Sequence, residues 1–197
     1  MVRGIAIMGL NGCGKSTLAH AIAKKLGFYE MDVEDYYFPE QKNSRQAILE
    51  QKYDVRCEYK GELPYSMPCS AKEVQEMIRG DIEEHPQFVI SGVTMNWEDD
   101  ILSVIDVAFI LEVPADERVK RVQQREEIRF GSRVMFGGDM YEQQREFREI
   151  IGSRSNQRVE ESANRMQCKK VKLNGTKSID ENVGIIISVL EEMVYQD

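Results

Sequence analysis

The sequence predicts an α/β fold in which a five-stranded parallel β-sheet is flanked by helices on both faces. Two observations favour this class. Short apolar runs of the kind found in buried parallel strands alternate along the chain with segments whose apolar residues recur at helical spacing. The first apolar run is followed at once by a glycine-rich turn and a helical segment, which is the order of a strand, its loop and its helix in a parallel sheet.

The expected strands are five short, mostly apolar runs, at residues 3–8, 28–32, 88–92, 104–113 and 170–173. In a parallel sheet covered by helices, ligands bind beyond the carboxyl ends of the strands. We therefore expect functional residues directly after these runs.

The expected helices have recognisable start and stop signals. They cover residues 16–26, 44–51, 116–128, 140–166 and 178–194, and a further helix opens at Ser70. Gly27 follows the first helix as a C-terminal stop. Ser70 with Glu73, and Ser178 with Glu181, have the spacing of a capping box. Residues 63–70, LPYSMPCS, contain two prolines and are expected to be extended.

Helical spacing also predicts which side chains of two helices face the core. They are Val74, Met77, Ile78 and Ile82 in the helix that opens at Ser70, and Val183, Ile186, Ile187, Leu190 and Val194 in the last helix.

Residues 9–17 read GLNGCGKST and match the P-loop pattern G-x-x-x-x-G-K-S. Glycines let several backbone N–H groups point into one concavity, and the following helix N-terminus adds partial positive charge. The pattern predicts that Lys15 lies near the outer phosphates of ATP and that the Ser16 hydroxyl binds Mg²⁺. The expected nucleotide contacts come from Gly9, Asn11, Gly12, Cys13, Gly14, Lys15, Ser16 and Thr17.

The composition of the chain narrows the class of protein further. A chain of 197 residues indicates one domain, and its net charge of −8 argues against a nucleic-acid surface. No apolar run is long enough to span a bilayer. The four cysteines form no C-x-x-C pair and the two histidines form no cluster, so reduced thiols in a cytoplasmic protein are expected. The predicted partner is a small-molecule phosphate acceptor, with no nucleic acid and no membrane, and the predicted state is a monomer or homodimer.

Two further segments carry a resemblance to a known family. Residues 113–125, VPADERVKRVQQR, and residues 174–179, NGTKSI, resemble segments of adenylate kinases. With the P-loop, they make the chain similar to the small P-loop kinases of the nucleoside-monophosphate kinase and shikimate kinase group. The resemblance implies a three-layer P-loop NTPase fold and phosphoryl transfer from ATP. It also implies that Arg121 stacks on adenine, that Arg125 reaches the phosphates, and that Gly175 and Thr176 border the adenine ring.

Arg121, Arg125 and Arg129 recur at four-residue steps and therefore share one stripe of a helix. Such a stripe is also typical of a solvated face paired with acids. The glycine-interrupted segment that follows favours the functional interpretation, because phosphoryl transfer needs mobile cations that close over the phosphates. We expect residues 126–140 to form a mobile lid that carries Arg129 and Arg133. Arg125, with Arg129 or Arg133, is expected to neutralise the charge on the transferring group.

The acceptor side is expected near residues 31–38, MDVEDYYF, where three acids follow the second strand. By resemblance, Asp32 is the first candidate to position the acceptor and hold the metal, and Asp35 is the second. A capped, solvated turn is the alternative interpretation. Tyr36, Tyr37 and Phe38 either stack on a ring or belong to the core. The acceptor-binding insert is expected to span residues 36–84 of the single kinase domain, residues 1–197.

One departure from the family concerns the third strand. Adenylate-type kinases carry D-G-x-P-R there, and its Arg grips the acceptor phosphate. This chain has SGVTMNW at residues 91–97, so only Gly92 matches. Recognition of a monophosphate then requires another cation, and the alternatives are Arg45, Arg56, Arg145, Arg148 and Arg154. Trp97 is a candidate pocket wall.

The sequence thus predicts an ATP- and Mg²⁺-dependent kinase for a nucleotide, a nucleoside or a hydroxylated metabolite. The alternative is an NTP-binding ATPase or regulatory protein without a small-molecule acceptor.

Overall fold

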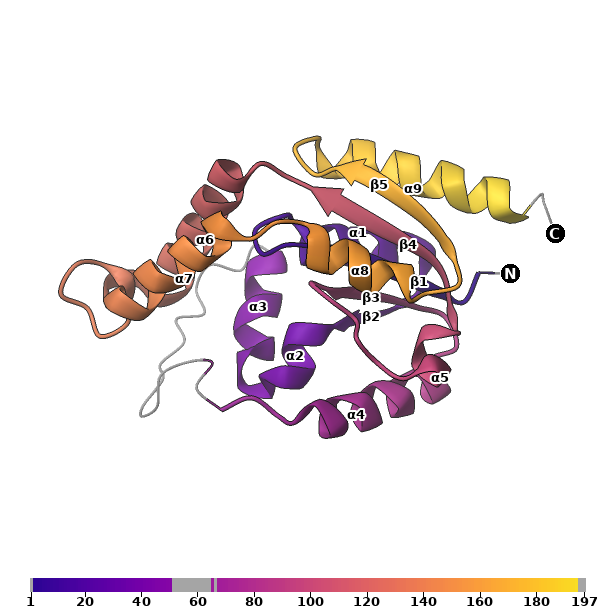
Figure 1. Ribbon diagram of the computed structural model, residues 1–197, viewed down its shortest axis with the longest axis horizontal. Coiled ribbons are helices and arrows are strands. Elements are labelled where there is room, and N and C mark those ends of the chain that lie inside the picture. Colours follow the sequence, from indigo (N-terminus) through magenta and orange to yellow (C-terminus); the bar gives the residue numbers. More distant parts are fainter. Residues whose placement is uncertain (1, 51–64, 66, 195–197) are drawn as a thin grey trace.

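The structure is a computed structural model that describes residues 2–50, 65 and 67–194 of the 197-residue chain. Its centre is a parallel β-sheet covered by helices (Figure 1). The strands are β1 (Gly4–Gly9), β2 (Tyr29–Asp32), β3 (Phe88–Gly92), β4 (Ile105–Glu112) and β5 (Lys169–Asn174). Each strand begins and ends within one residue of the predicted run, so the five-stranded parallel sheet is confirmed.

The strand order is β2-β3-β1-β4-β5, and every neighbouring pair is parallel. In the register of the sheet, Ile7 of β1 lies between Ser91 of β3 and Phe109 of β4, and Asp32 of β2 pairs with Ser91. The carboxyl ends of the strands therefore meet along one edge. The segments that follow β1, β2 and β3 are brought together there.

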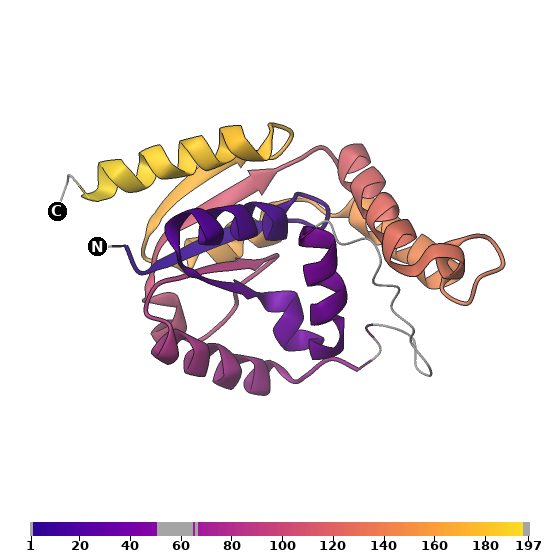
Figure 2. The ribbon, with the colours of Figure 1, turned by 180° about the vertical axis from the view of Figure 1, so that it is seen from behind.

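Helices cover both faces of the sheet, as predicted (Figures 1 and 2). α1 (Lys15–Leu26) and α9 (Ile179–Val194) pack together on one face, and α8 (Gln157–Asn164) lies on the other. α6 (Ala115–Phe130) and α7 (Tyr141–Ser153) pack against each other and project beyond the sheet edge. The remaining helices are α2 (Val33–Tyr37), α3 (Lys42–Leu49), α4 (Ala71–Glu84) and α5 (Asp99–Leu102), with 3₁₀ turns η1 (Pro39–Gln41) and η2 (Gly131–Val134).

The predicted helix signals at three termini are confirmed. α1 stops at Gly27, whose φ of 71° is in the left-handed region that favours glycine. Ser70 and Glu73 bond each other's backbone amides at the start of α4. Ser178 and Glu181 make the same pair of bonds before α9.

Two side chains predicted to face the core do not. Met77 of α4 is 39% exposed and Val194 of α9 is 58% exposed. The buried residues of these helices are Val74 and Ile78, and Asn182, Val183, Ile186 and Leu190. Met77 lies to one side of the buried stripe of α4, and Val194 is the last residue of its helix.

The single helix predicted for residues 140–166 is wrong. The chain forms α7 and α8, separated at Arg154, whose backbone is extended with φ −72° and ψ 130°. The buried Arg118 side chain donates to the carbonyls of Ile151 and Arg154, at 3.0 and 3.2 Å. These bonds satisfy carbonyl groups at the end of α7, where the helix itself offers no donor.

The second strand leads into a helix, α2, that was not expected, and α5 was not expected either. The helix predicted for residues 44–51 is α3, and residue 51 lies outside the described part of the chain. Of the predicted extended segment 63–70, residues 65 and 67–70 are described and contain no helix or strand. Within the described residues, no helix has the length and apolar character needed to cross a membrane.

Candidate active site

The phosphate-binding loop, residues 9–17, joins β1 to α1 and is curled. The amide of Cys13 and the ammonium of Lys15 each donate to the carbonyl of Leu10, at 3.2 Å. Gly12 has a φ of 84°, and a Cβ there would lie 2.4 Å from the carbonyl oxygen of Arg118. The curl therefore requires glycine at this position. The N-cap residue of α1 is Gly14, which has no side chain to bond the first amides of the helix.

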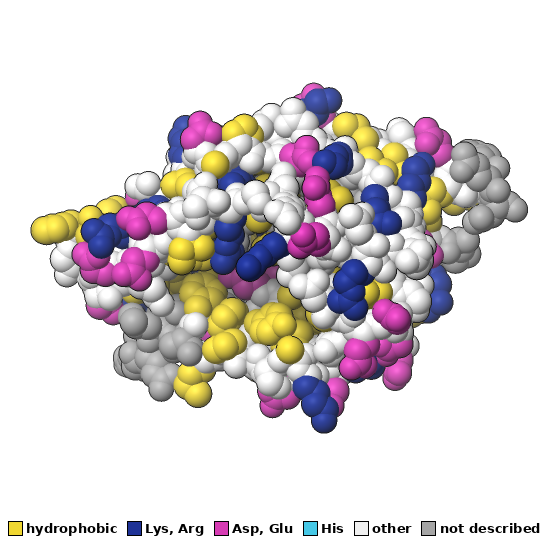
Figure 3. Space-filling view, in the orientation of Figure 1, with side chains coloured by type: hydrophobic (Ala, Val, Ile, Leu, Met, Phe, Trp, Pro, Cys, Tyr) yellow, Lys and Arg dark blue, Asp and Glu magenta, His cyan; other side chains and the backbone are white. Residues whose placement is uncertain are grey.

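A cleft of about 480 Å³ opens from this loop across the carboxyl edge of the sheet. We call it the central cleft. Figure 3 shows a hollow in this face, with basic side chains along its upper edge, an acid at depth and apolar side chains below. The phosphate loop contributes Asn11, Gly12, Lys15 and Ser16, and the β2–α2 segment contributes Asp32, Val33, Glu34, Tyr37 and Phe38. The other lining residues are Tyr65, Ala71, Gln75, Gly92, Val93, Thr94, Asn96, Trp97, Arg125, Glu126, Gln143, Gln144 and Phe147.

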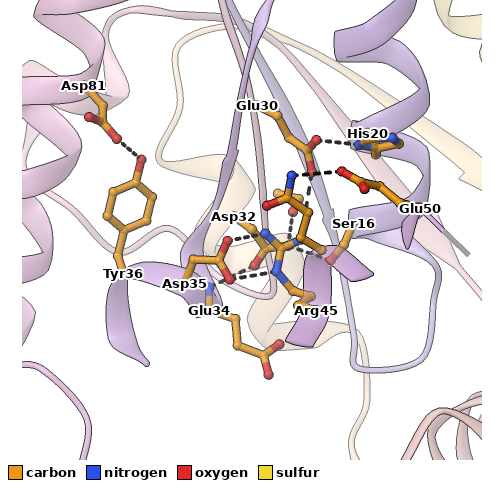
Figure 4. A network of polar contacts seen from close by, with 12 residues as sticks. Ser16, His20, Glu30, Asp32, Glu34, Asp35, Tyr36, Arg45, Glu50 and Asp81 are labelled. Atoms are coloured by element: carbon orange, nitrogen blue, oxygen red, sulfur yellow. Dashed lines mark hydrogen bonds and ion pairs between the residues drawn. The ribbon is translucent and has the colours of Figure 1, made fainter. Parts of the chain in front are cut away.

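Asp32 ends β2 directly beside the phosphate loop and is 4% exposed (Figure 4). Its Oδ2 accepts hydrogen bonds from the hydroxyls of Ser16 and Ser91, at 2.6 and 2.7 Å. Its Oδ1 accepts from the amide of Glu34 at 2.9 Å and caps α2. Both interpretations made from the sequence thus meet in one residue, because Asp32 caps a turn and also faces the loop.

Arg45 of α3 holds this carboxylate in its charged form. Its Nη1 lies 3.3 Å from Oδ2 of Asp32. Burial works against ionisation, but Arg45 and the hydrogen bonds from Ser16 and Ser91 together lower the pKa of Asp32. An ionised carboxylate beside a hydroxyl offers hard oxygen ligands, which suit Mg²⁺.

Within the described ranges, no group of three or more His, Cys, Asp or Glu side chains forms a metal cage. A magnesium ion held by Ser16 and Asp32 would take its other ligands from phosphates and water, as is usual for this ion.

Asp35, the second candidate, does not line the cleft. Its carboxylate is bound by the guanidinium of Arg45, with Nε donating to Oδ1 at 2.7 Å and Nη2 donating to Oδ2. Figure 4 shows Arg45 among Glu30, Asp32 and Asp35. Asp35 therefore anchors α3 next to the site.

Glu34 lines the central cleft and was missed as an individual candidate. It projects from the first turn of α2, two residues after Asp32. Burial lowers the pKa of Lys15, and the charges of Asp32 and Glu34 oppose that shift, which places Glu34 within electrostatic range of the ammonium. The signal in the sequence was the acid at the second position after the strand end.

Arg125 brings a second cation to the cleft from α6. Its Nε and Nη2 donate to Oε1 of Glu126, at 2.8 and 2.6 Å. Burial disfavours its charge, but Glu126 and Glu34 raise the pKa of Arg125, so it stays protonated. The expectation that Arg125 lies near the phosphate loop agrees with this placement.

The structure does not bring Arg129 and Arg133 to the cleft. Arg129 donates to Oε1 of Gln41 at 3.0 Å, and its guanidinium lies 5.5 and 5.2 Å from the ring centres of Tyr65 and Phe130. Arg133 lies in η2 and bonds the carboxylate of Asp139, with Nη2 2.7 Å from Oδ2. Of the predicted lid segment, residues 126–140, only Glu126 lines the cleft in this conformation.

The two segments that carry the family resemblance meet beside the phosphate loop. Nη1 of Arg121 donates to the carbonyl of Gly175 at 3.0 Å, and its Nε bonds Glu117 at 2.9 Å. A Cβ on Gly175 would lie 3.1 Å from the carbonyl oxygen of Cys13, so this loop packs closely on the phosphate loop. Thr176 donates its amide to Oδ1 of Asn174 at 2.9 Å, which shapes the turn.

Other predicted contacts differ in what they offer a ligand. Cys13 is 1% exposed and burial raises the pKa of its thiol, so only its backbone faces the loop concavity. Thr17 is exposed in the first turn of α1.

Trp97 lines the cleft, as expected for a pocket wall, and so do Tyr37 and Phe38. Tyr36 instead donates its hydroxyl to Asp81 and packs against the core.

Among the arginines considered as substitutes for the missing one, Arg154 contacts the phosphate loop. Its Nη1 donates to Oδ1 of Asn11 at 3.2 Å. Arg45 forms ion pairs with Asp32 and Asp35. Arg145 pairs with Glu142 at 2.8 Å. Arg56 lies outside the described residues.

The chain belongs to the AAA domain family, whose sequence model matches residues 5–133. The matched region contains the phosphate loop, Asp32 and Arg125. Along nearly its whole length the chain is similar to the uncharacterized protein YqaC of Bacillus subtilis (strain 168). The identity is 25% over 198 residues, covering 96% of this chain and 98% of the relative.

Solved structures of several kinases share the fold of this chain, which confirms the predicted fold class. A shikimate kinase from Bacteroides thetaiotaomicron matches with a TM-score of 0.55 and 17% identity, over 96% of this chain and 98% of that one. A gluconokinase from Sinorhizobium meliloti 1021 matches at 0.51 and 13%, over 100% and 98%. A deoxyadenosine kinase from M. mycoides matches at 0.51 and 17%, over 96% and 99%.

Proposed function

We propose that the protein is an ATP- and Mg²⁺-dependent phosphotransferase that acts on a small molecule. The proposal rests on one observation. The phosphate loop, with Lys15 and Ser16, and two carboxylates, Asp32 and Glu34, line a single cleft at the carboxyl edge of the sheet. A nucleotide-binding regulatory protein needs the loop alone, whereas a kinase also needs an acceptor space facing it.

The loop end of the cleft would hold the donor. Backbone amides of the curl and the Lys15 ammonium are suited to the outer phosphates of ATP. Ser16 and Asp32 would hold Mg²⁺, which would neutralise charge on the phosphates. Arg125 would stabilise the charge on the transferring group from the opposite wall.

Glu34 is the acid we propose for the acceptor hydroxyl. Both oxygens of Asp32 are engaged, by Ser16, Ser91 and the Glu34 amide, which suits a metal ligand and leaves little capacity for an acceptor. The Glu34 carboxylate faces the same cleft. A carboxylate within reach of a hydroxyl orients it and accepts its proton as the bond to phosphorus forms.

The remaining site assignments follow the same scheme. Residues 36–84 supply Tyr37, Phe38, Tyr65, Ala71 and Gln75 to the cleft wall, as an acceptor-binding insert would. The connection between α6 and α7 would act as the lid. Arg129 and Arg133 would approach the phosphates only in a closed form.

ADP formation from ATP and Mg²⁺, measured without and with a panel of hydroxylated metabolites, tests the proposal. An acceptor in the panel should raise the rate, and Glu34→Gln should lower that increment about 100-fold or more because a proton acceptor is lost. ATP binding should persist in this variant. Glu83→Gln, an exposed change on α4, is the matched control. A rate that is indifferent to every acceptor and to Glu34→Gln would favour the ATPase or regulatory alternative.

A further inference from the structure

Aromatic side chains from several elements line the central cleft. Tyr37 and Phe38 come from the α2 end, Tyr65 from the segment before α4, Trp97 from the segment after β3, and Phe147 from α7. Elements from four separate parts of the chain thus place a ring in one hollow. In the face shown in Figure 3, apolar side chains lie along the lower side of the hollow. Several rings around one space suit a flat, planar ligand group, because such a group stacks on aromatic side chains.

The charges of the lining disfavour an anionic acceptor. Among the described residues that line the cleft, only Lys15 and Arg125 are cationic, whereas Asp32, Glu34 and Glu126 are acidic. Lys15 belongs to the phosphate loop, and Arg125 is bonded to Glu126. A carboxylate or phosphate on the acceptor would therefore meet acids without a cation of its own.

Three buried oxygen atoms in the same lining have no hydrogen-bond partner among the residues that the structure describes. They are Oε1 of Gln143, Oε1 of Gln144 and Oε2 of Glu126. Gln144 is 3% exposed and Glu126 is 1% exposed, so both side chains are buried in the cleft wall. Buried acceptors without a donor are unfavourable, and native proteins pair nearly all of them. Rotation of the Gln143 or Gln144 carboxamide toward the cleft would let its oxygen accept a hydrogen bond from a ligand that carries N–H or O–H donors.

We propose that the phosphate acceptor is an uncharged nucleoside, an inference that rests on the proposed kinase function. Its base lies among the aromatic rings, with edge N–H groups donating to Gln143 and Gln144. Its hydroxyl points to the phosphate loop. The oxygen of that hydroxyl bonds to the γ-phosphorus, the bond from this phosphorus to ADP breaks, ADP takes the electron pair, and Glu34 takes the hydroxyl proton.

Trp97 makes acceptor binding measurable without catalysis, because it is the one tryptophan of the chain and lines the cleft. The protein is titrated with each candidate acceptor while the fluorescence of Trp97 is recorded. The candidates are adenosine, guanosine, cytidine and thymidine, their 5′-monophosphates, gluconate and shikimate. At least one nucleoside should quench this fluorescence saturably. Its monophosphate should bind at least about tenfold more weakly, since an added dianion meets the acidic side chains of Asp32, Glu34 and Glu126. Tighter binding of a monophosphate or sugar acid, or no saturable nucleoside binding, would overturn the inference.

Gln144→Leu tests the role of the buried carboxamide. It should weaken nucleoside binding about tenfold, because one buried hydrogen bond is lost. Gln123→Leu is the matched control, since Gln123 is exposed on α6 and bonds Glu127. An ATP-induced rise in melting temperature shows that each variant is folded. Phe147→Leu, which removes a ring from the same hollow, should also weaken binding. Unchanged nucleoside affinity in both cleft variants would contradict the assignment.

Failure of the proposed nucleoside site can be distinguished from failure of the proposed kinase activity. Saturable nucleoside binding that depends on Gln144, without transfer of γ-labelled phosphate from ATP, would support this acceptor site and contradict the kinase proposal. Transfer of label to a sugar acid, and to no nucleoside, would support the kinase proposal and overturn this inference.

Discussion

At the scale of single residues, the arrangement around Asp32 decides how the site is interpreted. One of its oxygens is shared by two serine hydroxyls and lies next to the guanidinium of Arg45, and the other oxygen caps α2. A carboxylate held this firmly is suited to bind a metal beside Ser16. In the proposed mechanism, Glu34, two residues further along the chain, then receives the proton of the acceptor hydroxyl.

The charge of Asp32 predicts a specific pH dependence of stability. Its pKa in the folded protein is lower than its ordinary value of 3.8, so the unfolded chain takes up this proton first as the pH falls. The stabilisation is complete above about pH 5 and is lost as the pH falls through 3.8 toward the folded pKa. Asp32→Asn should therefore be less stable than the wild type near pH 6, and the difference should shrink toward pH 3.

Urea unfolding at several pH values measures this difference. Asp180→Asn, an exposed change on α9, controls for the loss of one negative charge. A stability difference between wild type and Asp32→Asn that stays constant from pH 6 to pH 3 would refute the proposed ion pair with Arg45.

The sequence predicts those site residues that belong to a local pattern. Lys15 and Ser16 follow from the loop spacing, Asp32 from the end of a strand, and Arg125 from the helix after β4. Glu126, Gln144 and Phe147 carry no such pattern. They reach the cleft because α6 and α7 pack side by side, and no local spacing encodes that contact.

At the scale of elements, the two capping boxes are expected to contribute equally to the stability of the protein. They lie at the starts of two different helices, α4 and α9. Ser70→Ala and Ser178→Ala should each destabilise the protein by about 1 kcal/mol, because each leaves an N-terminal amide without its acceptor. For a chain of this size that corresponds to roughly 2–4 °C in melting temperature. Thermal unfolding of both variants measures the effect, and Ser70→Thr, which keeps a capping hydroxyl, is the control. A melting temperature that is unchanged in Ser70→Ala would contradict the cap seen at α4.

The helix break between α7 and α8 shows where element prediction failed. Polar helical spacing continues through residues 140–166, and no proline interrupts it. The run GSRSN at residues 152–156 is rich in turn-forming residues and was the available local signal. The break itself is stabilised by Arg118, which comes from α6 and donates to two carbonyls at the end of α7. Only the tertiary structure supplies those donors.

At the scale of the whole molecule, the alternation of strands and helices was enough to predict a parallel sheet with a site at its carboxyl edge. Alternation does not by itself determine strand order, and β3 lies between β2 and β1. That order brings Ser91 next to Asp32, which also bonds Ser16 of the phosphate loop. The strand order thus determines which of the predicted residues become neighbours.

Ligand binding to the assembled edge should stabilise the entire fold. The phosphate curl, the end of β2 and the start of α1 are brought together only in the folded chain. ATP with Mg²⁺ at 100 times its dissociation constant would therefore add about 2.7 kcal/mol, which corresponds to roughly 5–10 °C in melting temperature.

Calorimetric titration of ATP with Mg²⁺ into the wild type, Lys15→Ala and Lys24→Ala tests the central claim most directly. Lys24 lies exposed in the last turn of α1, so its loss controls for the removal of one positive charge. We predict saturable binding at one site in the wild type and in Lys24→Ala, and binding weakened at least about tenfold in Lys15→Ala, since its ammonium no longer meets the phosphates. Equal affinities in all three proteins would show that the nucleotide does not bind the phosphate loop.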